Sequence, residues 1–423
     1  MKKNVLFVVN QLHRGGAQKV VANLSNNLAS ASNIHIVIYN DVDQVDYAYS
    51  GTLIKIRLPF ARNAENNPFY ARIARFFSLI YSLRKIKKKY KIDVSISFME
   101  ASNFVNVLSR RREKTVLSVR TFLSEELGRV KGVSIYKVFI RFLYNRVDHI
   151  VVPSTMMKHD LCDNFGVSAG RIKVIHNFID IDKMAVSAQE TIEYPAVKRL
   201  FVENKVLVSV GRLDVQKGQD YLFPVLAAVK ASVPAIKLLL VGDGPLRETL
   251  VNKAADWGLK VCTSEQLKRE AGNAHEYDVY FLGAQQNPFK YLDKRSIFVF
   301  PSLYEGFPNA LLEAMVCGLP VISTDCLSGP RELLAPGTDL HYKTPATEYA
   351  PYGILMPDMP GQFEGQLSGI QGEIVRLWTE AVLKLIAEPD WAKEYAQKAA
   401  SRAKDFGKDI IVAQWNQLIY DNP

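Results

Sequence analysis

An apolar run, a glycine- and proline-containing loop and a second apolar stretch follow one another at residues 297–318. Ile297 to Phe300 has the composition of a buried strand, Glu305 to Pro308 that of a loop, and Ala310 to Val316 that of a helix. Asn309 is the expected N-cap of this helix, and Gly318 the expected stop. In an open α/β sheet, a helix that starts beyond the carboxyl end of a strand favours an anionic ligand. This stretch therefore predicts an α/β protein with an anion-binding site at this edge.

Two glutamates, Glu305 and Glu313, frame the predicted loop and helix. Eight residues of helix rise about 12 Å, whereas the paired carboxylates of a glycosidase lie roughly 5–9.5 Å apart. The two glutamates are therefore better placed to contact different parts of one elongated ligand. The alternative is that both are ordinary surface carboxylates.

The second half of the chain repeats the strand-and-turn pattern. Strands are predicted at 205–210, 237–241, 280–283 and 321–324, and the first three run into Gly211, Gly242 and Gly283. After the first strand, Arg212 and Lys217 stand among glycines, so this turn can admit a diphosphate closely and neutralise its charge.

The first half follows the same rhythm. Strands are predicted at 5–9, 34–39, 92–98, 115–119, 149–153 and 172–175. Gly15-Gly16 forms a turn after the first strand, but the spacing is not GxGxxG, so a dinucleotide site is only weakly indicated. Residues 178–200 lack a strong period and are interpreted as an interdomain linker, and 371–420 as helical.

Together these motifs resemble glycosyltransferase family four, whose members have the GT-B fold. The residues that carry the resemblance are Gly15-Gly16-Ala17, Ile175-His176-Asn177, Gly211-Arg212-Leu213 with Lys217-Gly218, Val241-Gly242-Asp243-Gly244-Pro245, Glu305-x7-Glu313 and Gly329-Pro330-Arg331-Glu332. The resemblance implies two Rossmann-like α/β domains facing across a cleft, with a C-terminal helix that returns to the first domain. An acceptor-binding domain is expected at 1–185 with 405–423, and a nucleotide-sugar domain at 186–404.

The resemblance also implies roles for individual residues. Glu305, Arg212 and Lys217 would be catalytic. The donor would be bound by Gly15, Gly16, Gly211, Gly242, Gly283, Gly306, Phe307, Pro308, Asn309, Glu313, Arg331 and Glu332. The implied reaction transfers a hexose or N-acetylhexosamine from a nucleotide sugar, most simply a UDP-sugar, with retention and with no cofactor or metal ion.

Charge is distributed unevenly along the chain. Residues 1–200 hold 31 lysines and arginines against 16 aspartates and glutamates, a formal charge of +15, whereas the remaining 22 and 27 give residues 201–423 a charge of −5. A basic half indicates an anionic partner, either nucleic acid or an anionic membrane surface. The sequence contains no recognisable RNA-binding motif, so we expect the anionic partner to be a membrane surface rather than nucleic acid.

The most unusual basic stretch is a predicted helix at 69–91. Ile73, Phe76, Phe77, Ile80 and Leu83 share one stripe, flanked by Arg72 and Arg75. The stripe can face the core, or it can meet lipid while the cations meet headgroup or pyrophosphate oxygens. The second interpretation assigns Arg72, Arg75, Arg120 and the cluster Arg110, Arg111 and Arg112 to a lipid-pyrophosphate-linked glycan acceptor at the inner face of the cytoplasmic membrane.

Arg120 stands where many relatives carry a histidine, and it cannot act as a base for the acceptor hydroxyl. Glu125 or Glu126 could accept the proton, although exposed helix carboxylates are the simpler interpretation.

The cysteines and the apolar segments further restrict the class of protein. The four cysteines are scattered without CxxC spacing, which argues against a zinc site and suits a reducing compartment. The five-residue apolar run near the N-terminus reads as a strand rather than a signal peptide, and no run approaches the roughly 20 apolar residues that span a bilayer.

Two other classes remain open. A nucleotide-sugar epimerase of the same fold would release a changed sugar without an acceptor, and a non-catalytic scaffold would not turn over donor at all.

Overall fold

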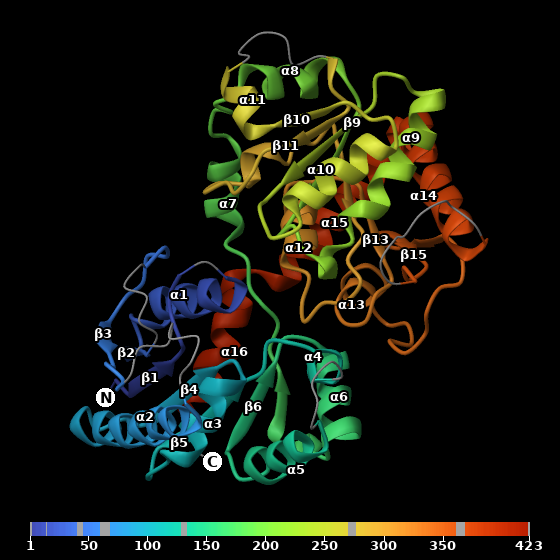
Figure 1. Ribbon diagram of the computed structural model, residues 1–423. Coiled ribbons are helices and arrows are strands. Elements are labelled where there is room, and N and C mark those ends of the chain that lie inside the picture. The colour runs from blue at the N-terminus through green and yellow to red at the C-terminus, as the bar shows by residue number, and fades with distance from the viewer. Residues whose placement is uncertain are drawn as a thin grey trace. The chain divides into compact units, whose positions relative to one another are not determined.

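The computed structural model describes residues 2–13, 15–39, 45–59, 68–127, 133–269, 276–360 and 369–421. The chain forms two compact units (Figure 1): unit 1 comprises Met1–Phe178 and Asp409–Pro423, and unit 2 comprises Ile179–Lys408. Each unit is a mainly parallel sheet with helices on both faces, which confirms the predicted α/β class. The chain passes between the units at 178/179 and 408/409, close to the boundaries expected at 185/186 and 404/405.

Unit 1 is built on seven strands in the order β3-β2-β1-β4-β5-β6-β7, all parallel. The strands are β1 (Asn4–Val8), β2 (Asn33–Ile38), β3 (Thr52–Lys55), β4 (Val94–Phe98), β5 (Lys114–Ser118), β6 (His149–Val152) and β7 (Ile172–Val174). The helices are α1 (Gly16–Leu28), α2 (Phe69–Lys89), α3 (Glu100–Leu108), α4 (Leu123–Leu127), α5 (Val133–Tyr144), α6 (Thr155–Phe165) and α16 (Lys408–Tyr420). Strand order reverses between β1 and β4, and ligands of doubly wound sheets bind beyond the carboxyl ends of the strands at such a point.

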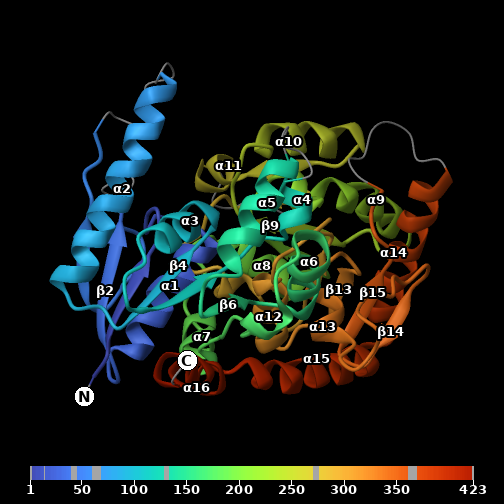
Figure 2. The same ribbon diagram turned by 90° about the horizontal axis from the view of Figure 1, so that it is seen from below.

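The two faces of the unit 1 sheet carry separate cores. On one face, Trp415 and Leu418 of α16 pack with Val21 and Leu24 of α1. On the other, Leu79 and Leu83 of α2 are buried against the strands. The last helix of the chain thus completes the core of unit 1 (Figure 2), as expected from the sequence.

Unit 2 has eight strands in the order β10-β11-β9-β8-β12-β13-β15-β14, and only β14 runs antiparallel to its neighbour. The strands are β8 (Val206–Val210), β9 (Lys237–Val241), β10 (Val261–Thr263), β11 (Val279–Phe281), β12 (Ile297–Phe300), β13 (Val321–Thr324), β14 (Glu348–Ala350) and β15 (Gly353–Met356). The helices are α7 (Ile181–Ala188), α8 (Pro195–Glu203), α9 (Leu222–Ser232), α10 (Arg247–Asp256), α11 (Ser264–Arg269), α12 (Asn309–Val316), α13 (Pro330–Leu334), α14 (Gly369–Ala387) and α15 (Pro389–Ala403).

Three sequence-based expectations need correction. The stretch 178–200 is not a linker: it forms α7 and the start of α8, and Met184 and Val197 are buried in the unit 2 core. Asn309 is the first residue of α12 rather than its N-cap, a position taken by Pro308. The helical tail is broken into α14, α15 and α16, with breaks at Glu388 and Gly407. Arg14 and residues 270–275 and 361–368 lie outside the described residues.

Candidate active site

A buried ion pair at the carboxyl edge of the unit 2 sheet joins two of the three residues predicted to be catalytic. The Lys217 Nζ lies 2.5 Å from the Glu305 Oε1. Lys217 ends the turn after β8, and Glu305 lies in the loop after the neighbouring strand β12. Glu305 is only 5% exposed. Adjacent parallel strands thus bring together two residues that are 88 positions apart in the chain.

Backbone contacts fix the two loops against one another. The Leu303 N–H donates to the Gln216 carbonyl at 2.8 Å, and the Gln216 side chain donates to the Tyr304 carbonyl at 2.8 Å. Gly218 has φ +58°, and a Cβ there would lie 2.3 Å from the Pro301 oxygen. Glycine is therefore required for the close packing that holds Lys217 beside Glu305.

The Glu305 loop also rests on the turn that precedes α13. The Glu305 N–H donates to the Leu327 carbonyl at 3.2 Å, and the Ser328 hydroxyl donates to the Gly306 carbonyl at 2.9 Å. Gly329 has φ +100°, and an added Cβ would lie 2.2 Å from Pro308 Cδ. Phe307 is buried and contacts Phe406, with ring centroids 5.9 Å apart. The loop 304–308 is therefore supported along its length before any ligand arrives.

Three of the predicted donor-binding glycines pack against one another at the same edge. The Gly211 N–H donates to the Val241 carbonyl, and the Gly242 N–H donates to the Gly283 carbonyl, both at 3.0 Å. A Cβ on Gly242 would lie 1.9 Å from the Gly211 oxygen. Gly242 therefore has to be glycine because the turn after β8 approaches it closely, whereas Gly283 is favoured by its φ of +71° and a Cβ on Gly211 would make only ordinary contacts.

Arg212 and Glu313 extend the site from the central pair. The Arg212 side chain is 68% exposed, and its Nε lies 3.5 Å from Asp214 Oδ2, so its guanidinium can reorient toward a ligand. Glu313 is half-buried on α12, in the second turn after the loop.

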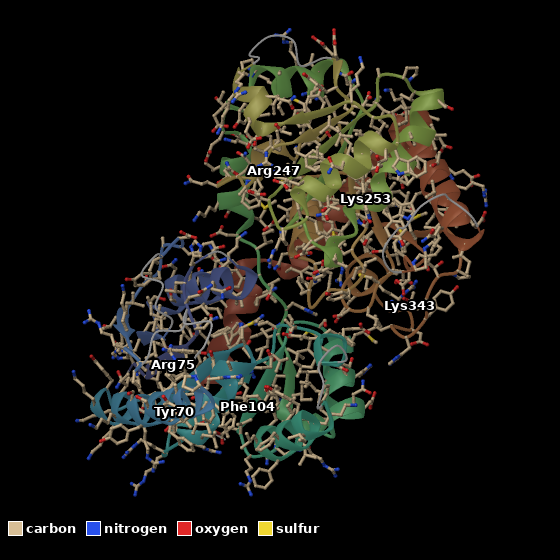
Figure 3. The ribbon with its side chains drawn as sticks, in the orientation of Figure 1. Tyr70, Arg75, Phe104, Arg247, Lys253 and Lys343 are labelled. Atoms are coloured by element: carbon tan, nitrogen blue, oxygen red, sulfur yellow. The ribbon has the colours of Figure 1, made fainter. Side chains whose placement is uncertain are left out.

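The structure engages Arg331 in a network of its own. Its guanidinium is buried and forms ion pairs with Asp325 at 2.5 Å and with Glu348 at 2.7 Å. The Thr344 N–H also donates to Asp325, at 2.9 Å, and Lys343 (Figure 3) donates to the Asp325 carbonyl. Arg331 therefore ties residues 343–348 to the carboxyl end of β13. Glu332 follows it in α13 and is almost fully buried.

The sequence between α13 and α14 is rich in glycine and proline, and this network anchors its described part, residues 336–360. Its described part supplies β14, which pairs antiparallel with β15 and extends the sheet at one edge.

In unit 1, the Gly15-Gly16 turn opens α1 at the strand-order reversal. A Cβ on Gly15 would lie 2.1 Å from the Gln18 Oε1, whereas a Cβ on Gly16 would meet nothing within 4 Å. The protein itself therefore does not require glycine at position 16.

Arg120 lies beyond the carboxyl end of β5, at the same edge. Its Nη1 donates to the Asn177 Oδ1 at 2.6 Å, and its guanidinium lies 5.5 Å from the Phe98 ring centroid. Its Nε and Nη2 are shielded from solvent and have no partner among the described residues. Burial lowers the pKa of Arg120 to about 9, which leaves it charged at neutral pH.

Glu100 is a candidate that sequence reasoning missed. It starts α3 directly after β4, and the preceding residue, Met99, has φ +73°, an unusual backbone conformation that often marks functional turns. Its Oε1 is shielded and has no partner within the described ranges. Burial, with a smaller contribution from the charge of Glu126, raises the pKa of Glu100 to about 8. The sequence could have pointed to Glu100 only through a local motif. A single glutamate after a predicted strand is not such a motif.

The remaining predicted cations lie elsewhere in unit 1. Arg110, Arg111 and Arg112 precede β5 and so lie at the opposite edge from Arg120. Arg110 forms an ion pair with Asp148 at 2.9 Å, which fixes the start of β6. Arg72 and Arg75 lie on the N-terminal half of α2. The structure thus separates the predicted acceptor residues into three places rather than one.

The exposed face of α2 and α5 is a further feature of unit 1. The exposed apolar side chains are Phe69, Tyr70, Ile73, Phe76, Phe77 and Tyr81 on α2, and Ile135, Tyr136, Val138, Phe139 and Phe142 on α5. Helix α3 contacts both helices, so the two groups belong to one layer. In Figure 2 the N-terminal half of α2 extends beyond the strands of its own unit, and Figure 3 shows Tyr70 and Arg75 there. We call these eleven side chains the aromatic face.

The described helices include none that is long and apolar enough to cross a membrane. No cluster of three or more metal-binding side chains occurs in the described part of the chain. None of the four cysteines is in a disulfide.

The fold is that of the GT-B glycosyltransferases. The crystal structure of the Anabaena protein HepE with UDP and glucose superposes with a TM-score of 0.69, at 17% identity, over 99% of each chain. TarM superposes with a TM-score of 0.71, at 14% identity, over 100% of this chain and 99% of its own.

The chain belongs to glycosyltransferase family four. Residues 14–183 match the family Glycosyltransferase Family 4, and residues 204–355 match the family Glycosyl transferases group 1. An uncharacterised glycosyltransferase of Methanocaldococcus jannaschii is 30% identical over 80% of this chain and 82% of its own. A Campylobacter jejuni protein named N-acetylgalactosamine-N,N'-diacetylbacillosaminyl-diphospho-undecaprenol 4-alpha-N-acetylgalactosaminyltransferase is 28% identical over 96% of each chain.

Proposed function

We propose that this glycosyltransferase moves a hexose or N-acetylhexosamine from a UDP-sugar to a lipid-pyrophosphate-linked saccharide during synthesis of a bacterial surface glycan. The transfer would retain the anomeric configuration and need no metal ion. The acceptor would be reached from the inner face of the cytoplasmic membrane, to which the protein binds peripherally. The observation that carries this proposal is the aromatic face, because an enzyme with only soluble substrates has no use for it.

The donor half of the reaction requires charge stabilisation. The bond between the sugar C1 and the β-phosphate oxygen breaks, the acceptor oxygen bonds to C1 from the same face, and the hydroxyl proton passes to the departing phosphate. Negative charge develops on the diphosphate, and a preorganised cation lowers the barrier to that step. Lys217 and Arg212 are the cations at the edge of unit 2 where this charge would develop.

Lys217 has to serve two partners in this scheme. Without a ligand it is bound to Glu305. We expect the diphosphate to draw the Lys217 ammonium toward itself, which frees Glu305 to accept hydrogen bonds from sugar hydroxyls. Glu313 would accept from the ribose hydroxyls.

The proposed acceptor is inferred from the exposed side chains of α2. Phe69 is 75% exposed and Phe77 is 63% exposed. An apolar face bordered by cations binds the boundary between acyl chains and anionic headgroups. Arg72 and Arg75 on the same half of α2 would then meet headgroup or pyrophosphate oxygens. In the Campylobacter relative, the name itself specifies an acceptor linked to diphospho-undecaprenol.

A binding experiment tests the donor. The melting temperature of the purified protein is measured with UDP, GDP, ADP and CMP, first in chelator and then with magnesium. We expect UDP alone to raise it in chelator, because a ligand that binds only the folded state stabilises it. A shift with GDP alone would overturn the UDP assignment, and a shift only with magnesium would overturn metal independence.

A paired substitution tests the acceptor. Arg72→Ala with Arg75→Ala is expected to lower transfer to a lipid-pyrophosphate-linked saccharide far more than it lowers UDP affinity. Lys88→Ala with Lys89→Ala removes the same charge from the other end of α2 and serves as the matched control. Equal losses in transfer and in UDP affinity, or equal losses in the two double variants, would contradict the assignment of Arg72 and Arg75.

A further inference from the structure

Unit 2 contains a cavity at the amino edge of its sheet, away from the loops described above. Its volume is about 540 Å³, within the range of small-molecule sites. Val206 and Ile297, the first residues of β8 and β12, form one wall. The donor loops follow the last residues of these same strands. A nucleotide sugar bound at those loops therefore does not occupy the cavity.

The walls of the cavity are apolar. Besides the strand residues, Val316 at the end of α12, Leu385 of α14 and Ala396 of α15 line it. Burial raises the pKa of the Cys317 thiol, with a smaller contribution from Glu313, to about 12, so this side chain is neutral as well. Apolar walls of this kind favour a hydrocarbon body over a polar one.

The charged residues that line the cavity are all cations. They are Lys205, Lys294, Arg295 and Lys393, and no aspartate or glutamate belongs to the lining. Arg295 is paired with Asp293 at 2.8 Å, which lies outside the lining. Lys205, Lys294 and Lys393 form no ion pair within the described ranges. Three uncompensated ammonium groups beside an apolar wall complement a ligand with an anionic head and a hydrocarbon chain.

We propose that this cavity binds a long-chain fatty acid, with its acyl chain along the wall of α15 and its carboxylate among Lys205, Lys294 and Lys393. A carboxylate joined to a hydrocarbon chain combines the two chemistries of the lining, cationic side chains and apolar walls. The site is independent of the proposed donor and acceptor.

The cavity is joined to the donor loops by shared elements. Strands β8 and β12 and helix α12 each contribute to the cavity at one end and to the loops of Lys217 or Glu305 at the other. A fatty acid that shifts α12 can therefore alter donor affinity, and the coupling would be reciprocal.

The test is direct binding of cis-parinarate, a fluorescent fatty acid, to the full-length protein below its micellar concentration. We expect saturable binding at one site, displaced by palmitate and at least tenfold more weakly by hexadecanol, which has the same chain without the charge. Lys294→Glu with Lys393→Glu is expected to weaken binding at least tenfold. Ala400→Trp, which places an indole in the cavity, is expected to abolish it.

Controls locate the bound probe. Lys260→Glu with Lys268→Glu makes the same charge change on exposed residues of unit 2 outside the cavity and should leave binding unchanged. The melting temperature of each variant, measured without any ligand, reports whether it is folded. Absence of saturable binding, equal displacement by hexadecanol, or unchanged binding in the lysine double variant would each overturn the proposal, whether or not Ala400→Trp folds.

Discussion

The carboxyl edges of the two sheets differ in how their polar groups are satisfied. In unit 2, Glu305 is bound by Lys217 and Gln216, and its loop is held by backbone bonds to the turns on either side. In unit 1, the Oε1 of Glu100 and two nitrogens of Arg120 are buried without a partner in the described residues. The central carboxylate of the unit 2 edge thus has a cation, although Asp214 Oδ1 and Ser302 Oγ nearby have no partner among the described residues, whereas in unit 1 the charged groups themselves have unpartnered atoms.

This difference bears on how each edge would treat its ligand. Buried polar groups without partners cost free energy, about 1–3 kcal/mol each, unless a ligand or water satisfies them. The unit 1 edge therefore holds groups that a hydroxyl or phosphate could satisfy. The unit 2 edge instead has to exchange an existing ion pair for contacts with its ligand.

The largest effect is expected from breaking the ion pair at the unit 2 edge. Lys217→Ala should lower kcat by about 100- to 1,000-fold, the usual loss when a preorganised group that stabilises developing charge is removed. It also leaves the buried Glu305 carboxylate without its cation, so the melting temperature should fall. Lys253→Ala, which removes an ion pair with Asp220 outside the site, is the control. Activity near that of the wild type in Lys217→Ala would refute the role of the pair.

A smaller loss is expected at the unit 1 edge, from Arg120. Arg120→Met keeps most of the side-chain volume and removes the charge, so activity on the acceptor should fall about 10- to 100-fold, as for a lost charged hydrogen bond. UDP affinity should not change. Steady-state kinetics with the acceptor varied would show a raised KM, and an unchanged KM would mean that the two unpartnered nitrogens of Arg120 do not meet the acceptor.

The Gly15-Gly16 turn offers a finer comparison. Gly16→Ala meets no protein atom within 4 Å and adds a better helix former at the first position of α1, so the melting temperature should stay level or rise slightly. If a ligand phosphate approaches this backbone, UDP affinity should fall about tenfold, or 1.4 kcal/mol. Gly372→Ala, also in open space near a helix start, controls for the general effect of alanine. Unaltered UDP binding in Gly16→Ala would remove this turn from the donor site.

The last comparison concerns the protonation of Glu100 and is measured as stability rather than as activity. Its pKa is about 8 in the folded protein against an ordinary value of 4.5, so the unfolded chain loses this proton first as pH rises. The wild type should therefore lose stability relative to Glu100→Gln between about pH 4.5 and pH 8, and no further above pH 8. Melting temperatures of both proteins at pH 5 and pH 8 measure this. A constant difference at the two pH values would show that Glu100 is ionised in the folded state. Glu125→Gln is the control.

The sequence was most informative where the signal is local. Ile297–Phe300 and the helix that ends before Gly318 were predicted to within a residue, because an apolar run and a left-handed glycine mark their ends. Strands β3, β10 and β14 were missed because they lie at sheet edges and are partly exposed, so they lack the continuous apolar run that marks the buried central strands.

The parts of the site that were missed depend on long-range contacts. The surroundings of the Glu100 carboxylate come from segments far along the chain, since its charge helps to raise the pKa of Tyr144, and the sequence at residues 99–101 gives no sign of this. Arg331 was predicted near the sugar from resemblance, and that role stays a prediction. Its ion pair with Glu348 arises only because β14 folds back along β15. The pairing of Lys217 with Glu305 depends on β8 and β12 being neighbours, which sheet topology decides.

Helix α16 also sets the order in which this chain can mature. Trp415 and Leu418 complete a core whose other members, such as Val21 and Leu24, emerge from the ribosome nearly 400 residues earlier. Domains generally fold as they are synthesised, N-terminal first. Here unit 1 remains unfinished until all of unit 2 has been made, so a nascent chain exposes part of its first core throughout synthesis of the second. A stop codon shortly before α16 would therefore damage the opposite end of the sequence.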